Sequence, residues 1–89
     1  MMSRYYLQLR NHAGEMLDPD GTDCFDNPTL RNVVLLNARD VIAGDVKRGV
    51  LDLSFRIDAE DASGAVVHSL PFTDAIEVTS SEDLGHKSG

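Results

Sequence analysis

Four aspartates close together in the first third of the chain are the first residues to consider for chemistry. They are Asp18, Asp20, Asp23 and Asp26. Closely spaced carboxylates can supply the oxygen ligands that a calcium ion requires. A calcium loop of the EF-hand type needs ligands at positions one, three and five and glycine at position six, but counting from Asp18 puts Gly21 at position four. The spacing therefore favours a solvated acidic turn, and we predict no bound metal.

His68 and Cys24 are the other candidates for catalysis or metal binding. His68 alternates with Val66 and Leu70, so we expect all three on the buried side of a strand or at its margin. A histidine can act as a base or a ligand near neutral pH, but His68 has no partner at a suitable spacing. Cys24 precedes a predicted helix N-terminus, which favours a thiolate, whereas the aspartates around it disfavour one. We therefore interpret both residues as structural, and we predict no enzymatic activity and no cofactor.

The basic residues in the middle of the chain make the best case for nucleic-acid binding. They are Arg31, Arg39, Lys47 and Arg48. At about 100° per residue they point in different directions around a helix and form no basic stripe. An RNA-binding sheet presents two or three aromatic residues in basic surroundings, whereas Tyr6 here would share its surroundings with Asp58 and Glu60. A solvated helix face explains these charges better than nucleic-acid binding does, and we keep an antitoxin-like, nucleic-acid-binding regulator as the alternative function.

Length and composition predict a small single domain. The chain has 89 residues, of which 42% are hydrophobic and 26% are charged, as in ordinary globular proteins. A domain of this size buries only about 60 to 65% of its unfolded surface, so a partner or a second copy could supplement its core. The net charge of −7 is concentrated in residues 50–89, which carry two basic and eight acidic side chains. This charge opposes binding to nucleic acid and to anionic membranes.

Other features of the sequence predict the cellular location. Cys24 is the only cysteine, so no intrachain disulfide can form. The first residues lack the apolar run of a secretory signal, and no apolar run approaches the roughly 18 residues that would span a membrane. We therefore expect a cytoplasmic protein that does not contact membranes. The sequence also contains no phosphate-binding loop, and we expect no small-molecule substrate.

Alternating residues predict the strands that position these side chains. Residues 4–10 alternate, with Tyr5, Leu7 and Leu9 on one face. The other face carries Arg4, Tyr6, Gln8 and Arg10. A short return strand at residues 15–17 and a turn at residues 18–21 should follow. Residues 55–60 and 66–70 alternate around a turn at residues 61–64 and predict a β-hairpin.

A single long helix is predicted between these strands. Asn27 can cap the free amides of a helix that runs from Pro28 to about Arg48, and Gly49 suits its left-handed end. Gly44 is unfavourable inside a helix by about 1 kcal/mol, so either the last turn frays or another backbone comes close there. The expected buried stripe is Leu30, Val34, Ala38, Val41 and Ile42. The shared core should contain Leu7, Leu9, Leu30, Val34, Val41, Phe55, Ile57 and Leu70.

Several landmarks occur in a recognisable order along the chain. They are Arg4-Tyr5-Tyr6, Asp20-Gly21, one helix, Gly64, Leu70-Pro71-Phe72 and Asp74-Ala75-Ile76-Glu77-Val78. This order resembles a family of small bacterial proteins known only as a domain of unknown function, whose members open Arg-Tyr-aromatic and close Pro-Phe-x-Asp-Ala-aliphatic-Glu. The resemblance covers about residues 3–78 and implies a shared fold, with no activity, substrate or cofactor. His68 and the apolar run at residues 33–36 depart from the family pattern.

Together these patterns predict an α+β domain over residues 1–78 and a disordered tail over residues 79–89. The domain should contain a mainly antiparallel sheet of three or four strands with one long helix on one face, in the order β-(β)-α-β-β. Such a sheet leaves one face and at least one edge open, so we predict a non-enzymatic interaction or regulatory module. The partner would be another protein or a second copy in a homodimer, with the first strand as the contact if it lies at the edge. The predicted surface consists of Arg4, Tyr6, Gln8 and Arg10.

Overall fold

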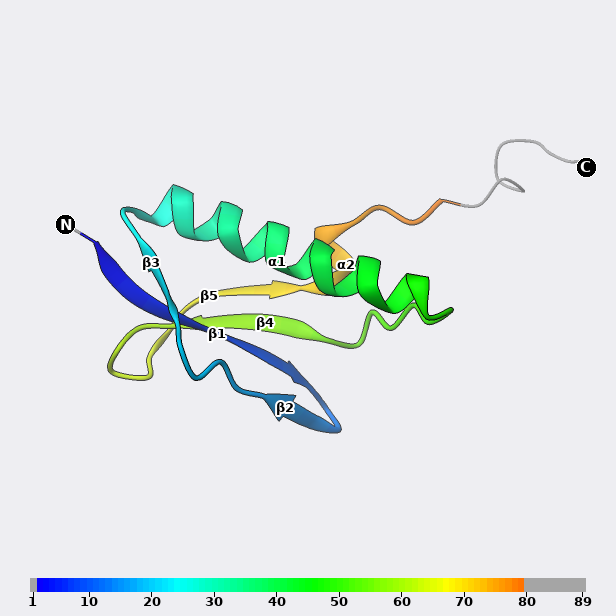
Figure 1. Cartoon of the computed structure of the whole chain (residues 1–89), viewed down its shortest axis with the longest axis horizontal. Coiled ribbons are helices and arrows are strands. Elements are labelled where there is room, and N and C mark those ends of the chain that lie inside the picture. The colour runs from blue at the N-terminus through cyan, green and yellow to red at the C-terminus, as the bar shows by residue number, and fades with distance from the viewer. Residues whose placement is uncertain (1, 80–89) are drawn as a thin grey trace, which may run out of the picture.

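An antiparallel sheet of five strands, with one long helix on one side, forms the protein (Figure 1). The computed structural model describes residues 2–79. Its elements are β1 (Ser3–Asn11), β2 (Gly14–Met16), β3 (Thr22–Cys24), α1 (Asn27–Lys47), β4 (Arg56–Glu60), β5 (Val66–Pro71) and α2 (Phe72–Ala75). The predicted α+β architecture is confirmed, with five strands in place of three or four. Of the predicted tail, residues 80–89 lie outside the described residues.

The strand order places β1 inside the sheet. The order is β2-β1-β4-β5, and β3 also pairs with β1. Leu9 of β1 lies between Ile57 of β4 and Met16 of β2, while Ser3 pairs with Cys24 of β3. The sequence left open whether the first strand is at the edge, and the structure shows that it is not. Dimerisation through β1 was predicted only if β1 is an edge strand, and this condition is therefore not met.

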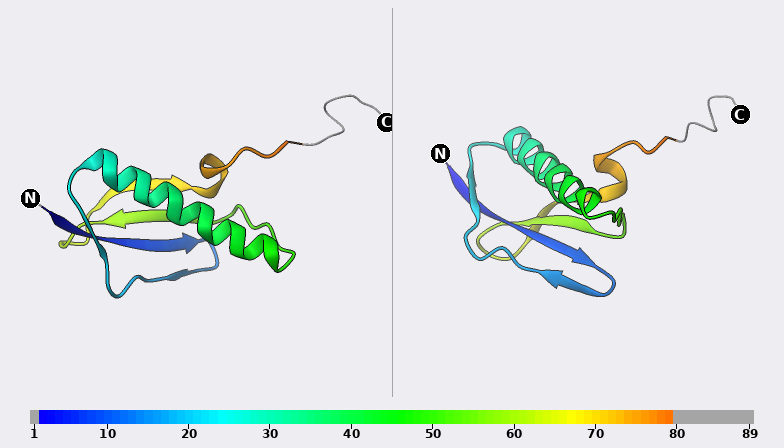
Figure 2. Two further views of the ribbon diagram at one scale, coloured as in Figure 1. Left: turned by 45° about the horizontal axis from the view of Figure 1, so that its top comes forward. Right: turned by 45° about the vertical axis from the view of Figure 1, so that its right-hand side comes forward.

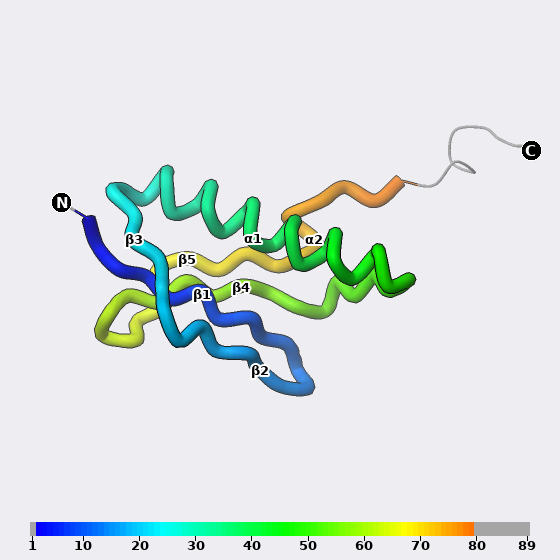
Figure 3. The backbone as a smooth tube through the Cα atoms, in the orientation of Figure 1, coloured from blue at the N-terminus to red at the C-terminus, as the bar shows by residue number. Residues whose placement is uncertain are grey.

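β2 and β3 are two parts of one return strand, interrupted where the backbone turns away at residues 17–21 (Figure 3). The Asp18 carboxylate fills the gap by accepting the backbone N–H of Leu7 at 3.3 Å and those of Asp20 and Gly21 at 3.1 Å. The Gln8 side-chain oxygen accepts the Asp18 N–H at 2.7 Å. These bonds replace the ladder that a continuous strand would make, because backbone polar groups inside a sheet need partners.

The β4–β5 hairpin is confirmed, but its register contains a β-bulge that the sequence did not predict. Ala59 is opposite His68, whereas Glu60 is opposite Val66, so Val67 is an extra residue on β5. Val66 therefore lies on the same face as Glu60 and is 52% exposed. The expectation that Val66 faces the buried side was wrong, because the bulge reverses the alternation between Val66 and His68.

α1 begins and ends close to the predicted boundaries. Its N-cap is Asp26 rather than Asn27, because the Asp26 Oδ1 atom accepts the Thr29 N–H at 2.9 Å. Beyond its last residue, Gly49 adopts a φ of +84°, as expected for a glycine that ends a helix. The buried stripe consists of Leu30, Val34, Ala38 and Ile42. Val41, which was also expected in this stripe, is only half-buried.

α1 covers only part of the sheet. It packs over β4 and β5 and reaches β3, while α2 lies against α1 (Figure 2). The Arg39 Nε atom donates to the carbonyl of Ala75 at 2.8 Å, so this side of α1 faces α2. The buried core is Cys24, Leu30, Val34, Ala38, Ile42, Ile57, Ala59, Phe72 and Ala75. The other predicted core residues are only partly buried, namely Leu7, Leu9, Val41, Phe55 and Leu70.

Candidate functional site

The sheet face turned away from α1 carries the four residues that the sequence predicted as a surface. They are Arg4, Tyr6, Gln8 and Arg10, which alternate along β1. Paired strands place polar residues beside them, because directly opposed residues share a face of a sheet. These neighbours are Glu15, Asp23, Arg56, Asp58, Glu60 and Ser69. The structure thus brings the predicted residues together and adds partners from every other strand.

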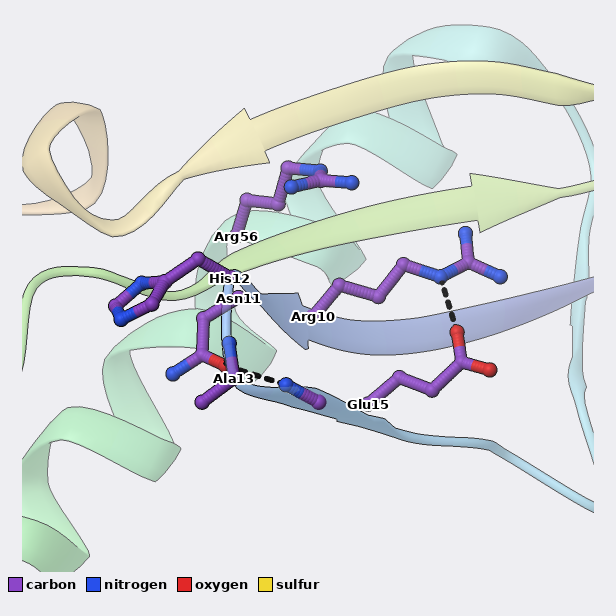
Figure 4. Close-up of a pocket in the computed structure, with 7 residues that line it drawn as sticks. Arg10, Asn11, His12, Ala13, Glu15 and Arg56 are labelled. Atoms are coloured by element: carbon purple, nitrogen blue, oxygen red, sulfur yellow. Dashed lines mark hydrogen bonds and ion pairs between the residues drawn. The ribbon is translucent and has the colours of Figure 1, made fainter.

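Arg10 is the centre of an ion-pair network on this face. Its Nε atom lies 2.8 Å from Glu15 Oε1, a contact drawn in Figure 4. Its Nη1 atom lies 2.8 Å from Glu60 Oε2 and 3.1 Å from Asp58 Oδ2. The hydrogen bonds that Arg10 donates to Glu15, Glu60 and Asp58 raise the pKa of its guanidinium above the usual value. The Arg10 guanidinium is therefore paired with three carboxylates.

Asp58 is buried although it lies on the face that no helix covers. It is 5% exposed, because Arg10 and Arg56 lie over it. Its Oδ1 atom accepts the Ser69 hydroxyl at 2.6 Å, and Arg56 Nε lies 3.1 Å from Oδ2. Burial alone would raise the pKa of Asp58, but hydrogen bonds from Ser69, Arg10 and Arg56 hold it below the ordinary value. The charges of this face are thus largely satisfied within the chain.

Arg4 and Tyr6 contact the segment that joins β2 to β3. Arg4 Nε lies 3.1 Å from Asp23 Oδ1, and its Nη1 atom donates to the Asp20 carbonyl at 2.6 Å. The Tyr6 ring lies close to Gly21, since a Cβ atom there would meet Tyr6 Cε2 at 3.0 Å. These two side chains therefore hold the interrupted return strand on β1.

A surface hollow lies at the end of this face, around the β1–β2 turn (Figure 4). Arg10, Arg56 and the turn residues 11–15 line it. The Asn11 side-chain oxygen organises the turn by accepting the N–H groups of Ala13 at 2.8 Å and Gly14 at 3.0 Å. Both guanidinium groups of the hollow are already paired with carboxylates. The hollow therefore offers little to attract an anionic ligand.

The two residues considered for catalysis are confirmed as parts of the packed interior or its margin. Cys24 is 2% exposed, and burial raises the pKa of its thiol, with Asp23 and Asp26 adding to the effect. A thiol in this environment is a poor nucleophile. His68 is half-buried on the side of α1, where burial and the charge of Arg31 lower its pKa.

Three of the four aspartates in the acidic segment have a local partner for their carboxylates, and Asp20 is exposed. Asp18 bonds to backbone amides, Asp23 pairs with Arg4 and Asp26 caps α1. Within residues 2–79, no group of three or more His, Cys, Asp or Glu side chains is arranged to hold a metal ion. Over the same residues, no helix is both long and apolar enough to cross a membrane.

Both edges of the sheet are poor templates for strand addition. The β5 edge ends at Pro71, which has no backbone N–H, and the bulge at Val67 interrupts it. The opposite edge is divided between β2 and β3, which carry Glu15 and Asp23. Proline, bulges, short strands and charges are the usual devices that prevent pairing between sheet edges.

The apolar side of β1 and β2 remains only partly covered, because α1 packs over the other half of the sheet (Figure 2). Leu7 and Leu9 of β1 are half-buried, and Met16 of β2 is 69% exposed. Met16 is opposite Leu9 and therefore shares its face. Leu17, next in the chain, is 56% exposed. It follows Met16 directly, and adjacent residues of a strand point to opposite faces, so Leu17 does not belong to this face. We call Leu7, Leu9 and Met16 the uncovered surface.

Sequence reasoning missed the uncovered surface. The alternation correctly assigned Leu7 and Leu9 to the apolar side of β1, and the segment containing Met16 and Leu17 was expected to be a strand. Which strands a single helix covers depends on long-range packing. The one available signal was the presence of two large apolar residues in a short strand next to a polar turn.

Comparison with known proteins gives one match. No curated protein and no solved structure is significantly similar to the chain. A family model matches residues 4–73, which include nearly all of β1 and every later strand and α1. The match ends at Thr73, so the closing run at residues 74–78 lies beyond it. The chain belongs to the family described as Domain of unknown function (DUF6894).

Proposed function

We propose that the protein is a non-enzymatic interaction module that binds another protein through the uncovered surface, Leu7, Leu9 and Met16. The observation that carries this proposal is the partial coverage of the sheet by α1, which leaves Met16 69% exposed and Leu7 and Leu9 only half-buried. Large apolar residues that gather on a surface mark sites of protein association, because their burial in a complex is favourable.

The charged face supports the proposal less well than the uncovered surface. Arg10 is paired with three carboxylates, and Asp58 is hydrogen-bonded to Ser69 and Arg56. A partner that bound there would have to replace these internal bonds, and such exchanges give little net affinity. This face can still contribute selectivity through its charge pattern.

The alternative function, nucleic-acid binding, has less support. Binding to phosphate needs basic groups that can exchange their counterions for the nucleic acid. Arg4, Arg10 and Arg56 are the basic residues of the sheet face, and each is paired with a carboxylate. The net charge of −7 also opposes association with a polyanion.

Comparative affinity capture tests the proposed function. Wild-type protein, Met16→Glu and a control, Val67→Glu, would be immobilised and exposed to extract from the native cell. Val67 is also an apolar strand residue, 47% exposed, but it lies on β5, at the opposite edge of the sheet from β2. We expect the same discrete protein with the wild type and the control, and its loss with Met16→Glu. Circular dichroism of each variant would verify folding.

The captured protein would then be purified and its binary affinity measured. A charge placed in a buried apolar contact should weaken binding by about tenfold or more, which corresponds to about 1.4 kcal/mol. Binding that Met16→Glu leaves intact and Val67→Glu abolishes would contradict the proposed surface. Sedimentation equilibrium of the unmixed protein would show whether a second copy is the partner.

A further inference from the structure

The segment that joins β2 to β3 contains Asp20 followed by Gly21, a pair that can undergo a spontaneous covalent change. Glycine has no side chain to hinder the attack of its backbone nitrogen on the preceding carboxyl group. In this reaction the Gly21 nitrogen bonds to Asp20 Cγ, and the nitrogen's proton leaves with the carboxyl hydroxyl as water. Water then opens the cyclic imide. Cleavage at the main-chain carbonyl of Asp20 gives isoaspartate, in which the main chain runs through the side-chain carboxyl carbon.

The Asp20 side chain is accessible for this reaction. It is exposed, whereas the carboxylates of Asp18, Asp23 and Asp26 are bonded to a backbone amide, to Arg4 and to the start of α1. The electrophilic carbon is therefore not held away from the Gly21 nitrogen by a bond of the kind that its three neighbours make.

The peptide group between Asp20 and Gly21 is held at both of its polar atoms. Asp18 Oδ1 accepts the Gly21 N–H at 3.1 Å, and Arg4 Nη1 donates to the Asp20 carbonyl at 2.6 Å. Ring closure requires this peptide group to rotate until its nitrogen eclipses the Asp20 Cβ atom, a conformation outside the main allowed backbone regions. Rotation breaks both hydrogen bonds. The negative charge of Asp18 also opposes loss of the proton from the Gly21 nitrogen.

The surroundings of Gly21 restrict this segment further. Its φ is +75°, and a Cβ atom there would lie 2.9 Å from Arg4 Cγ and 3.0 Å from both the Tyr5 carbonyl and Tyr6 Cε2. Isoaspartate lengthens the main chain by one methylene group. A segment packed this closely against β1 has no space for the longer chain, so the modified segment cannot return to its place.

We propose that Asp20–Gly21 is a site of spontaneous isoaspartate formation, which the folded domain suppresses by holding the peptide group with Asp18 and Arg4. Isomerisation then proceeds from states in which the segment opens locally. Because the modified segment no longer fits on β1, each such event is a one-way change. Asp18 and Arg4 act as positioning residues in this inference, which is independent of the proposed function because no step uses the uncovered surface.

The rate of isoaspartate formation tests this inference. Wild-type protein and a synthetic peptide of residues 16–23 would be incubated together at neutral pH and physiological temperature. Isoaspartate would be quantified with an isoaspartyl methyltransferase and located by mass spectrometry of the tryptic peptide 11–31. We expect formation to be slower in the protein by about tenfold or more, which corresponds to about 1.4 kcal/mol for local opening. Asp20→Glu is the negative control, since its longer side chain must close a larger ring.

Two variants test the roles of the positioning residues. Asp18→Ala removes the acceptor of the Gly21 N–H, and we expect it to accelerate isomerisation by about tenfold. Arg4→Ala removes the bond to the Asp20 carbonyl from a half-exposed position, where folding does not depend on burial, and it should also raise the rate. Ile57→Val is the matched control, because it lowers the stability of the core but leaves the segment intact, and it should not change the rate.

Four results would overturn the inference. Absence of isoaspartate in the peptide would remove the site, and equal rates in the peptide and the protein would remove the protection. Equal rates in wild type and Asp18→Ala would exclude the role of Asp18. Equal acceleration by Asp18→Ala and Ile57→Val would assign the reaction to global unfolding. The isomerised protein, separated by chromatography, should exchange the Leu7 amide hydrogen faster, because Asp18 accepts that N–H only in the docked segment. Unchanged exchange at Leu7 would contradict the one-way change.

Discussion

At the scale of single residues, Asp58 links the strands of the charged face. It is 5% exposed and accepts hydrogen bonds from Ser69, Arg10 and Arg56. Asp58→Asn removes the negative charge and leaves two guanidinium groups with one fewer partner, so we expect a loss of about 2 to 3 kcal/mol in the free energy of unfolding. Urea denaturation measures this loss. Asp23→Asn, at an exposed pair with Arg4, is the control and should cost less than about 1 kcal/mol.

The same carboxyl group makes stability depend on pH. The pKa of Asp58 is lower in the folded protein than its ordinary value of about 3.9, so the unfolded chain binds the proton more tightly. Its stabilising contribution is therefore complete above about pH 4 and is lost as the pH falls through the folded pKa. Acid titration of the wild type and Asp58→Asn should give curves that converge below pH 4. A constant difference between them down to pH 2 would contradict this role.

Gly21 is the residue where the backbone has the least freedom to accept a side chain. Its φ is +75°, and a Cβ atom would lie 2.9 Å from Arg4 Cγ and 3.0 Å from the Tyr5 carbonyl. Gly21→Ala combines an unfavourable backbone conformation with a steric overlap, and we expect a loss of about 1 to 3 kcal/mol. Gly14→Ala is the control, because nothing lies within 4 Å of its added Cβ. Equal urea midpoints for the two variants would show that the segment can move to relieve the overlap.

At the scale of elements, the interrupted return strand depends on Asp18. Its carboxylate accepts the N–H groups of Leu7, Asp20 and Gly21, and these bonds hold its pKa below the ordinary value although burial opposes this. Asp18→Ala leaves the Leu7 amide without its acceptor, so we expect about 1 to 3 kcal/mol lower stability. Hydrogen exchange should show faster exchange at Leu7, whereas Asp20→Ala should not affect it. Unchanged exchange at Leu7 in Asp18→Ala would mean that water replaces the carboxylate without cost.

The sequence predicted the elements whose signals are local. Alternation located β1 and the β4–β5 hairpin, and the spacing of Leu30, Val34 and Ala38 located α1. β3 was missed because three residues give no periodicity, and α2 because a four-residue helix is too short to show one. The bulge at Val67 was missed because it depends on the pairing of two strands. Short elements and registers are fixed by tertiary contacts that local patterns do not contain.

The same limit applies to the candidate site. Alternation placed Arg4, Tyr6, Gln8 and Arg10 correctly on one face of β1. The ion pairs that occupy Arg10 come from Asp58 and Glu60 on β4, far along the chain, and only the strand order brings them together. The position of α1 over β4 and β5 likewise decides which apolar residues remain exposed.

At the scale of the whole molecule, one side of the sheet is charged and the other is half-covered. The charged side stabilises the fold through bonds between β1, β2, β4 and β5. The half-covered side has apolar residues that the domain itself does not bury. In a domain of this size the core is small, and a partner that covers these residues would add stability to both molecules. We therefore expect binding to raise the melting temperature of the domain.

The signal of the Met16 methyl group tests the central claim most directly. In protein labelled with carbon-13 at its methionine methyls, Met16 reports on the uncovered surface, while Met2 lies before β1 and serves as an internal control. The purified binding partner would be added in steps. We predict a saturable shift of the Met16 signal with the Met2 signal unchanged. A complex that forms, as judged by sedimentation, while the Met16 signal stays at its free position would contradict it.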